Sequence, residues 1–407
     1  MSEKGTLNSF NLLCLWFGAA VSVAEIFTGG WLATDAGLGL GPGLWAIVLG
    51  HVVGTSLLAL GGIIGFNERL PSIMSTRISF GKQGSYLISV INVLQLIGWT
   101  AVMVLMGSSA LTQITETLWD YSNPVLMAAI LGAFIALWVG IGLHGFKYLN
   151  VVAVLLLFGL TIVLSVVVVG NPAPETTGSD SGSFALGFEL SIIMPLSWFP
   201  LIADYTSQAK SRTGSWLAPF IAYCVGSSWM YAIGFIGALY AGTSDPAAIM
   251  VAAGLGLAAL SVVGLSTITT TFMDVYSAAV STQNVFPKIS RRWTAVVMAV
   301  LGTILGMFFN MDAYVPFLLI LGSVFAPLVA ILLSDYFLFK RDARDRVLDP
   351  VAWMSLLLGI AFYHGTSLLE LESLFIAGHT LTTIIATVIM HGIIRVVQGS
   401  GKTAKQQ

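Results

Sequence analysis

Long apolar runs alternate with short polar links along the whole chain. Twelve runs are long enough to cross a bilayer, which takes about 20 residues of helix. The pattern therefore predicts twelve helical spans in one membrane domain covering residues 1–407. The predicted spans are 9–36, 43–66, 84–110, 123–143, 147–170, 184–204, 216–241, 247–282, 293–310, 313–338, 351–369 and 372–395.

The composition supports a membrane protein. Hydrophobic residues make up 57% of the chain, charged residues only 9%, and the mean hydropathy is +0.91. A soluble domain carries about 25% charged residues. A chain of 407 residues with so few charges can cover its surface only with lipid, and a net charge of −2 offers no basic surface for nucleic acid.

The basic residues predict the orientation. With twelve spans, all 17 Lys and Arg lie in links on the same side as the two termini, and the opposite links hold acidic residues without Lys or Arg. Cytoplasmic links carry an excess of Lys and Arg. We therefore expect a multi-pass protein of the cell (inner) membrane with both termini in the cytoplasm.

Two spans contain residues that interrupt a helix. Span six reads MPLSWFP, with Pro195 and Pro200, and span one reads VAEIFTGG, with Glu25 ahead of Gly29 and Gly30. A proline costs about 3 kcal/mol in a helix interior. Broken membrane helices are tolerated where they line a cavity, and in secondary transporters they hold substrate and ion at matching positions of inverted repeats. The two spans are five apart, as two five-helix repeats require. The alternative is that Pro and Gly are simply common in membrane helices.

Three carboxylates in the spans are candidate functional residues. Glu25 and Asp274 lie deep in spans one and eight. An acidic residue there costs at least about 2.5–3.5 kcal/mol and usually faces a cavity or a partner. Each could instead be a structural hydrogen-bonding residue. Asp204, at the cytoplasmic end of span six, is interpreted as a gate or helix-end residue.

Two further clusters suit a small planar ligand and a cation. Gln95 and Trp99 lie four residues apart, on one face of span three, and offer an amide beside an aromatic ring. Span eight contains STITTT, whose hydroxyls form a hard oxygen site for sodium if they face the carbonyls of a broken helix. Without such carbonyls, the same hydroxyls would simply bond to their own helix.

Several stretches resemble the nucleobase:cation symport-1 family over essentially the whole chain. The resemblance is closest to its cytosine permease-like branch and, within that branch, to hydroxymethylpyrimidine permeases of thiamine biosynthesis. The stretches are FGAAVSVAEIFTGGWLA, STRISFGKQGS, NVLQLIGWTAVM, SWFPLIADYT and GSVFAPLVAILLSDYF. The resemblance implies an all-α, leucine-transporter-type fold with discontinuous helices 1 and 6. It places repeat one at 9–170, repeat two at 184–338 and extra helices at 351–395.

The resemblance also implies site residues. Substrate would contact Gln95 and Trp99 in span three and the unwound part of span six at Pro195, Ser197 and Trp198. Sodium, in sodium-coupled members, would lie between span-one carbonyls and span-eight hydroxyls, here near Val21, Ala24, Phe27, Ser266, Thr269 and Thr270.

Departures from the family pattern bear on the substrate. Relatives tend to have a neutral residue at the position of Glu25 and often an asparagine near Asp274, and the spacing from Gln95 to Trp99 differs by one from cytosine permeases. A carboxylate can accept from the exocyclic amine of a 4-aminopyrimidine. We therefore expect Glu25 and Asp274 to contact substrate, with Glu25 alternatively serving proton coupling.

The function expected from the sequence is import of a pyrimidine, 4-amino-5-hydroxymethyl-2-methylpyrimidine, by cation symport and alternating access. Cytosine or another nucleobase is the alternative substrate, and the sequence leaves sodium and protons open as the coupling ion. No cofactor is expected. An intramembrane enzyme is disfavoured because no HExxH, GxSxG or paired-aspartate motif lies in the spans. A channel would more naturally show a polar filter repeated across subunits.

Overall fold

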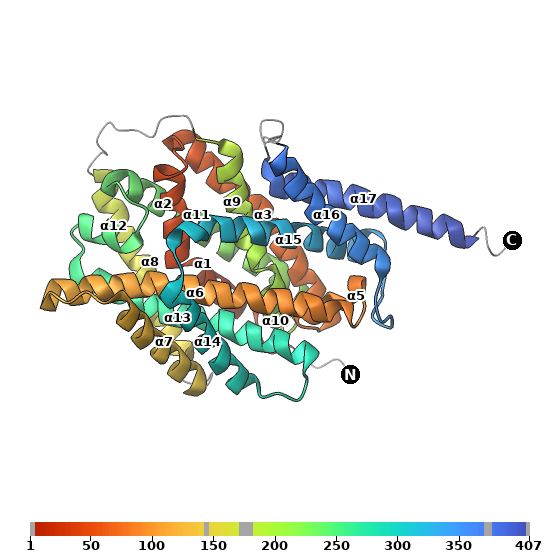
Figure 1. Cartoon of the computed structure of the whole chain (residues 1–407), viewed down its shortest axis with the longest axis horizontal. Helices are drawn as coiled ribbons and strands as arrows, with labels where there is room; N and C mark the ends of the chain where they lie inside the picture. Colours follow the sequence, from red (N-terminus) through yellow and green to blue (C-terminus); the bar gives the residue numbers. More distant parts are fainter. Residues whose placement is uncertain (1–4, 142–145, 171–181, 370–376, 404–407) are drawn as a thin grey trace.

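The computed structural model describes residues 5–141, 146–170, 182–369 and 377–403, and within these ranges its regular secondary structure is helical apart from one isolated bridge between Leu7 and Ala209 (Figure 1). Among the described residues, eleven helices are long and apolar enough to cross a membrane, and the bent pair α1–α2 supplies a twelfth span. The twelve predicted spans are confirmed. The labels N and C stand on the same side of Figure 1 as α5, as an even number of spans requires.

The helices of the first five spans are α1 Ser9–Ala20, α2 Val23–Thr34, α3 Leu40–Glu68, the short α4 Ser72–Ser75 and α5 Arg77–Phe80, α6 Gly84–Trp119, α7 Pro124–Ile141 and α8 Phe146–Gly170. Those of the next five are α9 Phe184–Ser197, α10 Phe199–Thr206, α11 Arg212–Ala241, α12 Pro246–Ala252, α13 Gly256–Val285, α14 Arg291–Phe308, η2 Met311–Ala313, α15 Tyr314–Leu333 and η3 Ser334–Leu338. The last two spans are α16 Pro350–Leu368 and α17 Gly378–Thr403.

The spans pack in two groups. Helices α1, α2, α3, α9, α10 and α11, which form spans one, two, six and seven, contact one another extensively. Helices α6, α7, α13 and α14, which form spans three, four, eight and nine, make a second packed group. Each group therefore combines two spans from the first half with the spans five places later in the chain.

The break in span one was predicted at the wrong residues. The helix is interrupted at Val21 and Ser22, where the two halves meet at a bend of 48°. The pair Gly29–Gly30 lies inside the continuous helix α2. These glycines serve helix packing instead, because a Cβ on Gly29 would lie 2.0 Å from the carbonyl oxygen of Tyr231. Small residues allow two membrane helices to approach this closely.

The break in span six was predicted in the correct stretch. Helix α9 ends at Ser197 and α10 begins at Phe199, so Trp198 forms the interruption. Pro195 itself remains inside α9, and Pro200 stands in the first turn of α10, where its missing N–H leaves no helical bond unmade.

Spans eleven and twelve are fixed by two buried carboxylate clusters. At one end of the bundle, Glu189 of α9 accepts hydrogen bonds from the hydroxyls of Tyr363 at 2.6 Å and Thr380 at 2.8 Å, and from backbone N–H groups of the first turn of α17. A carboxylate at a helix N-terminus satisfies free N–H groups and opposes the helix dipole.

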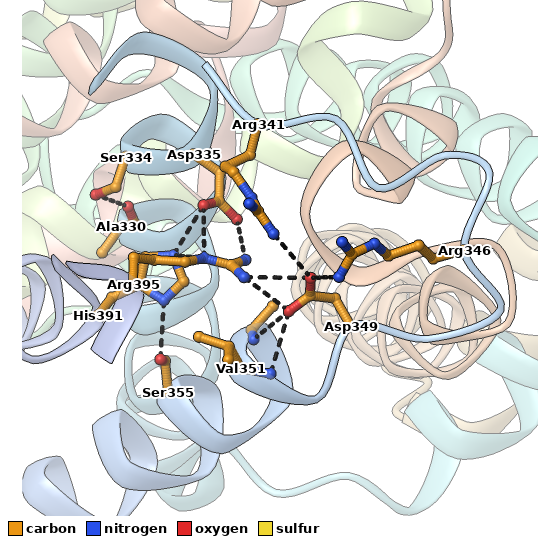
Figure 2. Close-up of polar contacts among 11 residues, drawn as sticks. Ala330, Ser334, Asp335, Arg341, Arg346, Asp349, Val351, Ser355, His391 and Arg395 are labelled. Atoms are coloured by element: carbon orange, nitrogen blue, oxygen red, sulfur yellow. Dashed lines mark hydrogen bonds and ion pairs between the residues drawn. The ribbon is translucent and has the colours of Figure 1, made fainter. Parts of the chain in front are cut away.

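At the other end of the bundle, beside α5, Arg395 of α17 lies between two aspartates (Figure 2). It donates to Asp335 at 2.8 Å and to Asp349 at 2.9 Å. His391 donates to Asp335 at 3.0 Å and contacts the Ser355 hydroxyl at 2.8 Å. These contacts join the ends of α15 and α17 to the start of α16.

Candidate substrate and cation site

A buried cavity lies where the two groups of spans meet at the breaks in spans one and six. Its volume is about 20 Å³, which is room for one or two water molecules. A pyrimidine can therefore enter only when the groups separate. The lining residues are Ser22, Ala24, Glu25, Leu96, Trp99, Met103, Met194, Ser197, Trp198, Leu201, Thr270 and Asp274.

Five of the seven predicted substrate residues line this cavity: Glu25, Trp99, Ser197, Trp198 and Asp274. Gln95 lies outside the lining, and its amide nitrogen donates to Asn92 Oδ1 at 2.8 Å and to the carbonyl of Ser197 at 3.2 Å. It therefore braces the break in span six. Pro195 is turned towards α3, because a Cβ on Gly54 would lie 2.5 Å from its ring.

Two indole rings form aromatic walls. Trp99 is held edge-on by Tyr314 and Phe317, with ring centroids 6.2 and 5.5 Å away. Trp198 is held by Trp16 at 6.1 Å and by Tyr223 at 6.3 Å. Rings fixed by their neighbours offer a flat ligand a stacking surface at little entropic cost.

Asp274 is the cavity residue whose carboxyl group has no hydrogen-bond or ion-pair partner among the described residues. Its side chain is 4% exposed and lines the cavity, yet none of the hydrogen bonds or ion pairs among the described residues involves its carboxylate. An unpaired buried carboxylate is costly. A ligand with an N–H donor or positive charge would satisfy it.

Glu25, in contrast, is already hydrogen-bonded. Its Oε1 accepts from Tyr223 at 2.7 Å and its Oε2 contacts the Ser227 hydroxyl at 2.8 Å. The same hydroxyl lies 2.6 Å from His51 Nε2. These contacts attach α2 to α11 and α3. A carboxylate has about four acceptor positions, so Glu25 can also accept from a ligand in the cavity.

The predicted cation residues are only partly gathered at the cavity. Ala24 and Thr270 line it, and Val21 lies at the break in span one. The hydroxyls of Ser266 and Thr270 are buried without a hydrogen-bond partner. Thr269 donates to the carbonyl of Ser266 at 3.0 Å, and Phe27 lies inside α2 with its ring against Tyr314. The unpaired hydroxyl of Thr270 lies beside the break in span one, where an oxygen ligand suits a hard cation, whereas Ser266 lies outside the cavity lining.

The cavity is closed on both sides by contacts between elements. Towards one end of the bundle, the Tyr314 hydroxyl of α15 lies 2.7 Å from the Thr28 hydroxyl, which donates to the carbonyl of Ala24 at 2.7 Å. Towards the other end, beside α4, Asp204 Oδ1 accepts from the Ser72 N–H at 3.0 Å and Oδ2 accepts from the Ser277 hydroxyl at 3.0 Å. Asp204 thus joins α10 to α13, one helix from each group.

We expect Asp204→Asn to loosen the closure at this end of the cavity. The amide replaces one acceptor by a donor, and leaving a buried donor unpaired costs about 1–3 kcal/mol. In a background without Cys14 and Cys224, a cysteine at buried Ser281 should react several-fold faster with an impermeant maleimide added from the side of the membrane that Asp204 closes. Ser277→Ala, which removes one of the two bonds, should give a smaller increase. Unchanged labelling in both variants would contradict this role for Asp204.

Sequence reasoning missed several residues of the site. Met103 could have been found, because it lies one helical turn from Trp99 on the same face. Tyr223 and Ser227 could not, since they lie 198 and 202 residues from Glu25 and no local pattern relates them.

Solved structures show the fold. The structure of Mhp1, a nucleobase-cation-symport-1 family transporter in a closed conformation with bromovinylhydantoin bound, matches with a TM-score of 0.81 and 20% identity, over 98% of this chain and 94% of that one. A substrate-bound, outward-open Na⁺-coupled sialic acid symporter matches with a TM-score of 0.65 and 12% identity, over 96% and 91%. The expected leucine-transporter-type 5+5 inverted repeat is confirmed. The chain therefore has the fold of these two proteins.

Sequence comparison then gives the family. The family model for permeases of cytosine/purines, uracil, thiamine and allantoin matches residues 2–349. The cytosine permease of Escherichia coli (strain K12) is 26% identical over 375 residues, which cover 89% of this chain and 86% of that protein. The chain belongs to this permease family, the nucleobase:cation symport-1 family. Both fold and family are those of transporters rather than enzymes.

Proposed function

We propose that the protein imports 4-amino-5-hydroxymethyl-2-methylpyrimidine by cation symport across the cell membrane, with both termini in the cytoplasm. The observation that carries this proposal is the unpartnered carboxylate of Asp274 in a cavity walled by Trp99 and Trp198. The indoles would stack on the ring, and Asp274 would accept from the 4-amino group in a charge-assisted hydrogen bond. Ser197, in the break of span six, would lie at the ring edge.

Sodium is the coupling ion that the hydroxyls favour. Ser266 and Thr270 have buried oxygens with no partner, and Ala24 and Val21 supply backbone at the break in span one. Oxygen ligands of this kind suit a hard cation. Bound sodium would tie α2, in one group of spans, to α13, in the other. Ion binding would thereby favour the arrangement of spans that binds substrate.

Alternating access would proceed by movement of the two groups of spans against each other. Opening to the cytoplasm must break the Asp204–Ser277 contact, and opening outward must break the Tyr314–Thr28 contact. The cavity lies between these two closures. A substrate held there is exposed to one side at a time.

The runner-up substrate is cytosine, because the compared permease of Escherichia coli carries that name and cytosine is itself a 4-aminopyrimidine. Uptake of labelled hydroxymethylpyrimidine into cells expressing the chain, competed by unlabelled cytosine, separates the two. The proposal expects uptake that resists an excess of cytosine. Uptake abolished by modest cytosine would overturn the choice of substrate and retain the family.

We expect Glu25→Gln to weaken substrate binding by about tenfold, because a hydrogen bond to a charged group contributes about 1.5–3 kcal/mol. Tyr223→Phe is the matched control. It removes one contact of Glu25 with α11 and leaves the carboxylate in the cavity, so it should lower thermal stability with little change in affinity. Binding can be followed by tryptophan fluorescence. Unchanged affinity and unchanged pH dependence of uptake in Glu25→Gln would exclude both substrate contact and proton coupling by this residue.

A further inference from the structure

A second cavity, of about 360 Å³, opens where the end of α3, the start of α11 and the segment after η3 meet. It shares no residue with the substrate cavity. We call it the basic pocket, because four of its lining residues are basic and two are acidic. Its residues are Asn67, Glu68, Ile78, Arg212, Tyr336, Phe337, Lys340, Arg341, Asp342 and Arg344.

Both acidic residues of the basic pocket are bound by one arginine. Arg344 donates to Glu68 Oε2 at 2.9 Å and to both oxygens of Asp342 at 2.9 Å. The other oxygen of Glu68 accepts the Tyr336 hydroxyl at 2.9 Å. Hydrogen bonding from Arg344 holds the pKa of Asp342 below its ordinary value, so the carboxylate stays charged and paired.

The other three basic residues form no ion pair with the two carboxylates of the pocket. No carboxylate of the described residues lies within 4.0 Å of Arg212 or Lys340. Arg341 reaches Asp349 only at 4.0 Å, and Figure 2 shows that Asp349 already binds Arg395 and Arg346. Four basic and two acidic residues therefore line one hollow, which leaves a net charge of +2 there.

The position of Lys340 is also unusual. Its φ is +50°, in the left-handed region that non-glycine residues seldom adopt. Lys340 terminates η3 in this conformation, as Arg69 and Asp120 terminate α3 and α6. Here the conformation places a lysine directly beyond the last turn of span ten, at the rim of the basic pocket.

We propose that the basic pocket binds the phosphodiester headgroup of an anionic phospholipid of the cytoplasmic leaflet. Guanidinium groups bind phosphate through paired hydrogen bonds, and lysine adds a point charge. The proposal uses the orientation given under Proposed function, which places this pocket at the cytoplasmic surface, and it is independent of the transported substrate.

A lipid suits the pocket better than free phosphate for two reasons. The pocket lies at the ends of membrane spans, the level at which headgroups lie, and basic pockets between spans on this side recognise anionic headgroups. Ile78 and Phe337 add apolar surface beside the cations, next to which the glycerol backbone of a lipid can pack.

The test measures lipid binding by the purified full-length chain in a neutral detergent. Native mass spectrometry would count bound dioleoylphosphatidylglycerol and dioleoylphosphatidylcholine across a titration. The variants are Arg212→Gln with Lys340→Gln, and a matched control, Lys288→Gln with Arg292→Gln. The control removes two exposed cytoplasmic charges outside the pocket. The melting temperature of each variant without lipid reports folding, and Lys340→Gln alone serves if the double variant is unstable.

The expected result is preferential binding of the anionic lipid, weakened on the order of tenfold in the pocket variant and unchanged in the control. Equal weakening in both variants, or equal binding of the two lipids, would show a diffuse surface charge and overturn the proposal. Binding of inorganic phosphate at millimolar concentration, without binding of either lipid, would overturn the assignment to lipid. Because no substrate is used, these outcomes are separate from success or failure of the transport proposal.

Discussion

Replacing Asp274 by alanine is expected to reduce binding of the aminopyrimidine at least 100-fold without destabilising the protein. The carboxylate has no partner among the described residues, so its removal breaks no contact there and relieves the cost of a buried charge. Loss of binding without loss of stability is expected of a functional carboxylate that is kept at the expense of stability. Replacing a structural carboxylate would instead lower stability and leave binding intact.

Asp274→Asn should give an intermediate effect, about tenfold, because it keeps a carbonyl acceptor and loses the charge. Affinity is read from quenching of tryptophan fluorescence, since Trp99 and Trp198 line the same cavity. The melting temperature is measured on the same samples. Asp312→Asn, an exposed acid outside the cavity, is the control. A fall in stability with intact affinity in Asp274→Ala would show that the residue is structural.

The second large effect is expected at Arg395. Replacing it by glutamine leaves Asp335 and Asp349 buried without their principal cation, and removing one partner of a buried ion pair costs about 3–5 kcal/mol. We therefore expect a large fall in melting temperature and poor accumulation in the membrane. The damage should concentrate where α17 meets the ends of α15 and α16 (Figure 2).

The matched control for Arg395 is Arg344→Gln. Arg344 also bridges two carboxylates, but its side chain is 40% exposed, and exposed pairs contribute about 0–1 kcal/mol. Adding Asp335→Asn to Arg395→Gln should recover part of the lost stability, since it removes one unpaired carboxylate. Equal stability of the Arg395 and Arg344 variants would contradict the account of this cluster.

The spans could be predicted because their signals are local. Hydrophobic length and the one-sided distribution of Lys and Arg are properties of consecutive residues, and all twelve spans were found. The exact break in span one could not be predicted this way. Adjacent glycines such as Gly29 and Gly30 predict a helix break. In the structure they allow α2 to pack closely against α11 at Tyr231, which lies more than 200 residues away in the sequence.

The site residues that could be predicted are those that are energetically unfavourable within a membrane helix. A carboxylate in a membrane span and a proline in a helix are both expensive, and Asp274 and the stretch ending at Trp198 do line the cavity. Gln95 shows the limit of this reasoning. It was predicted to contact substrate, but its amide nitrogen donates to Asn92 and to the carbonyl of Ser197. Glu189 is a second example. It caps the N-terminus of α17, and this role depends on the contact between α9 and α17, which lie far apart in the sequence.

The most direct test of the central claim, cation-coupled import of a pyrimidine, is uptake into vesicles containing only the purified protein. Labelled hydroxymethylpyrimidine is followed with an inward sodium gradient, and with equal sodium on both sides. The account predicts accumulation above the equilibrium level with the gradient, none without it, and loss of accumulation when Thr270 is replaced by alanine. Uptake that reaches only equilibrium, whatever the sodium gradient, would contradict sodium coupling at this site.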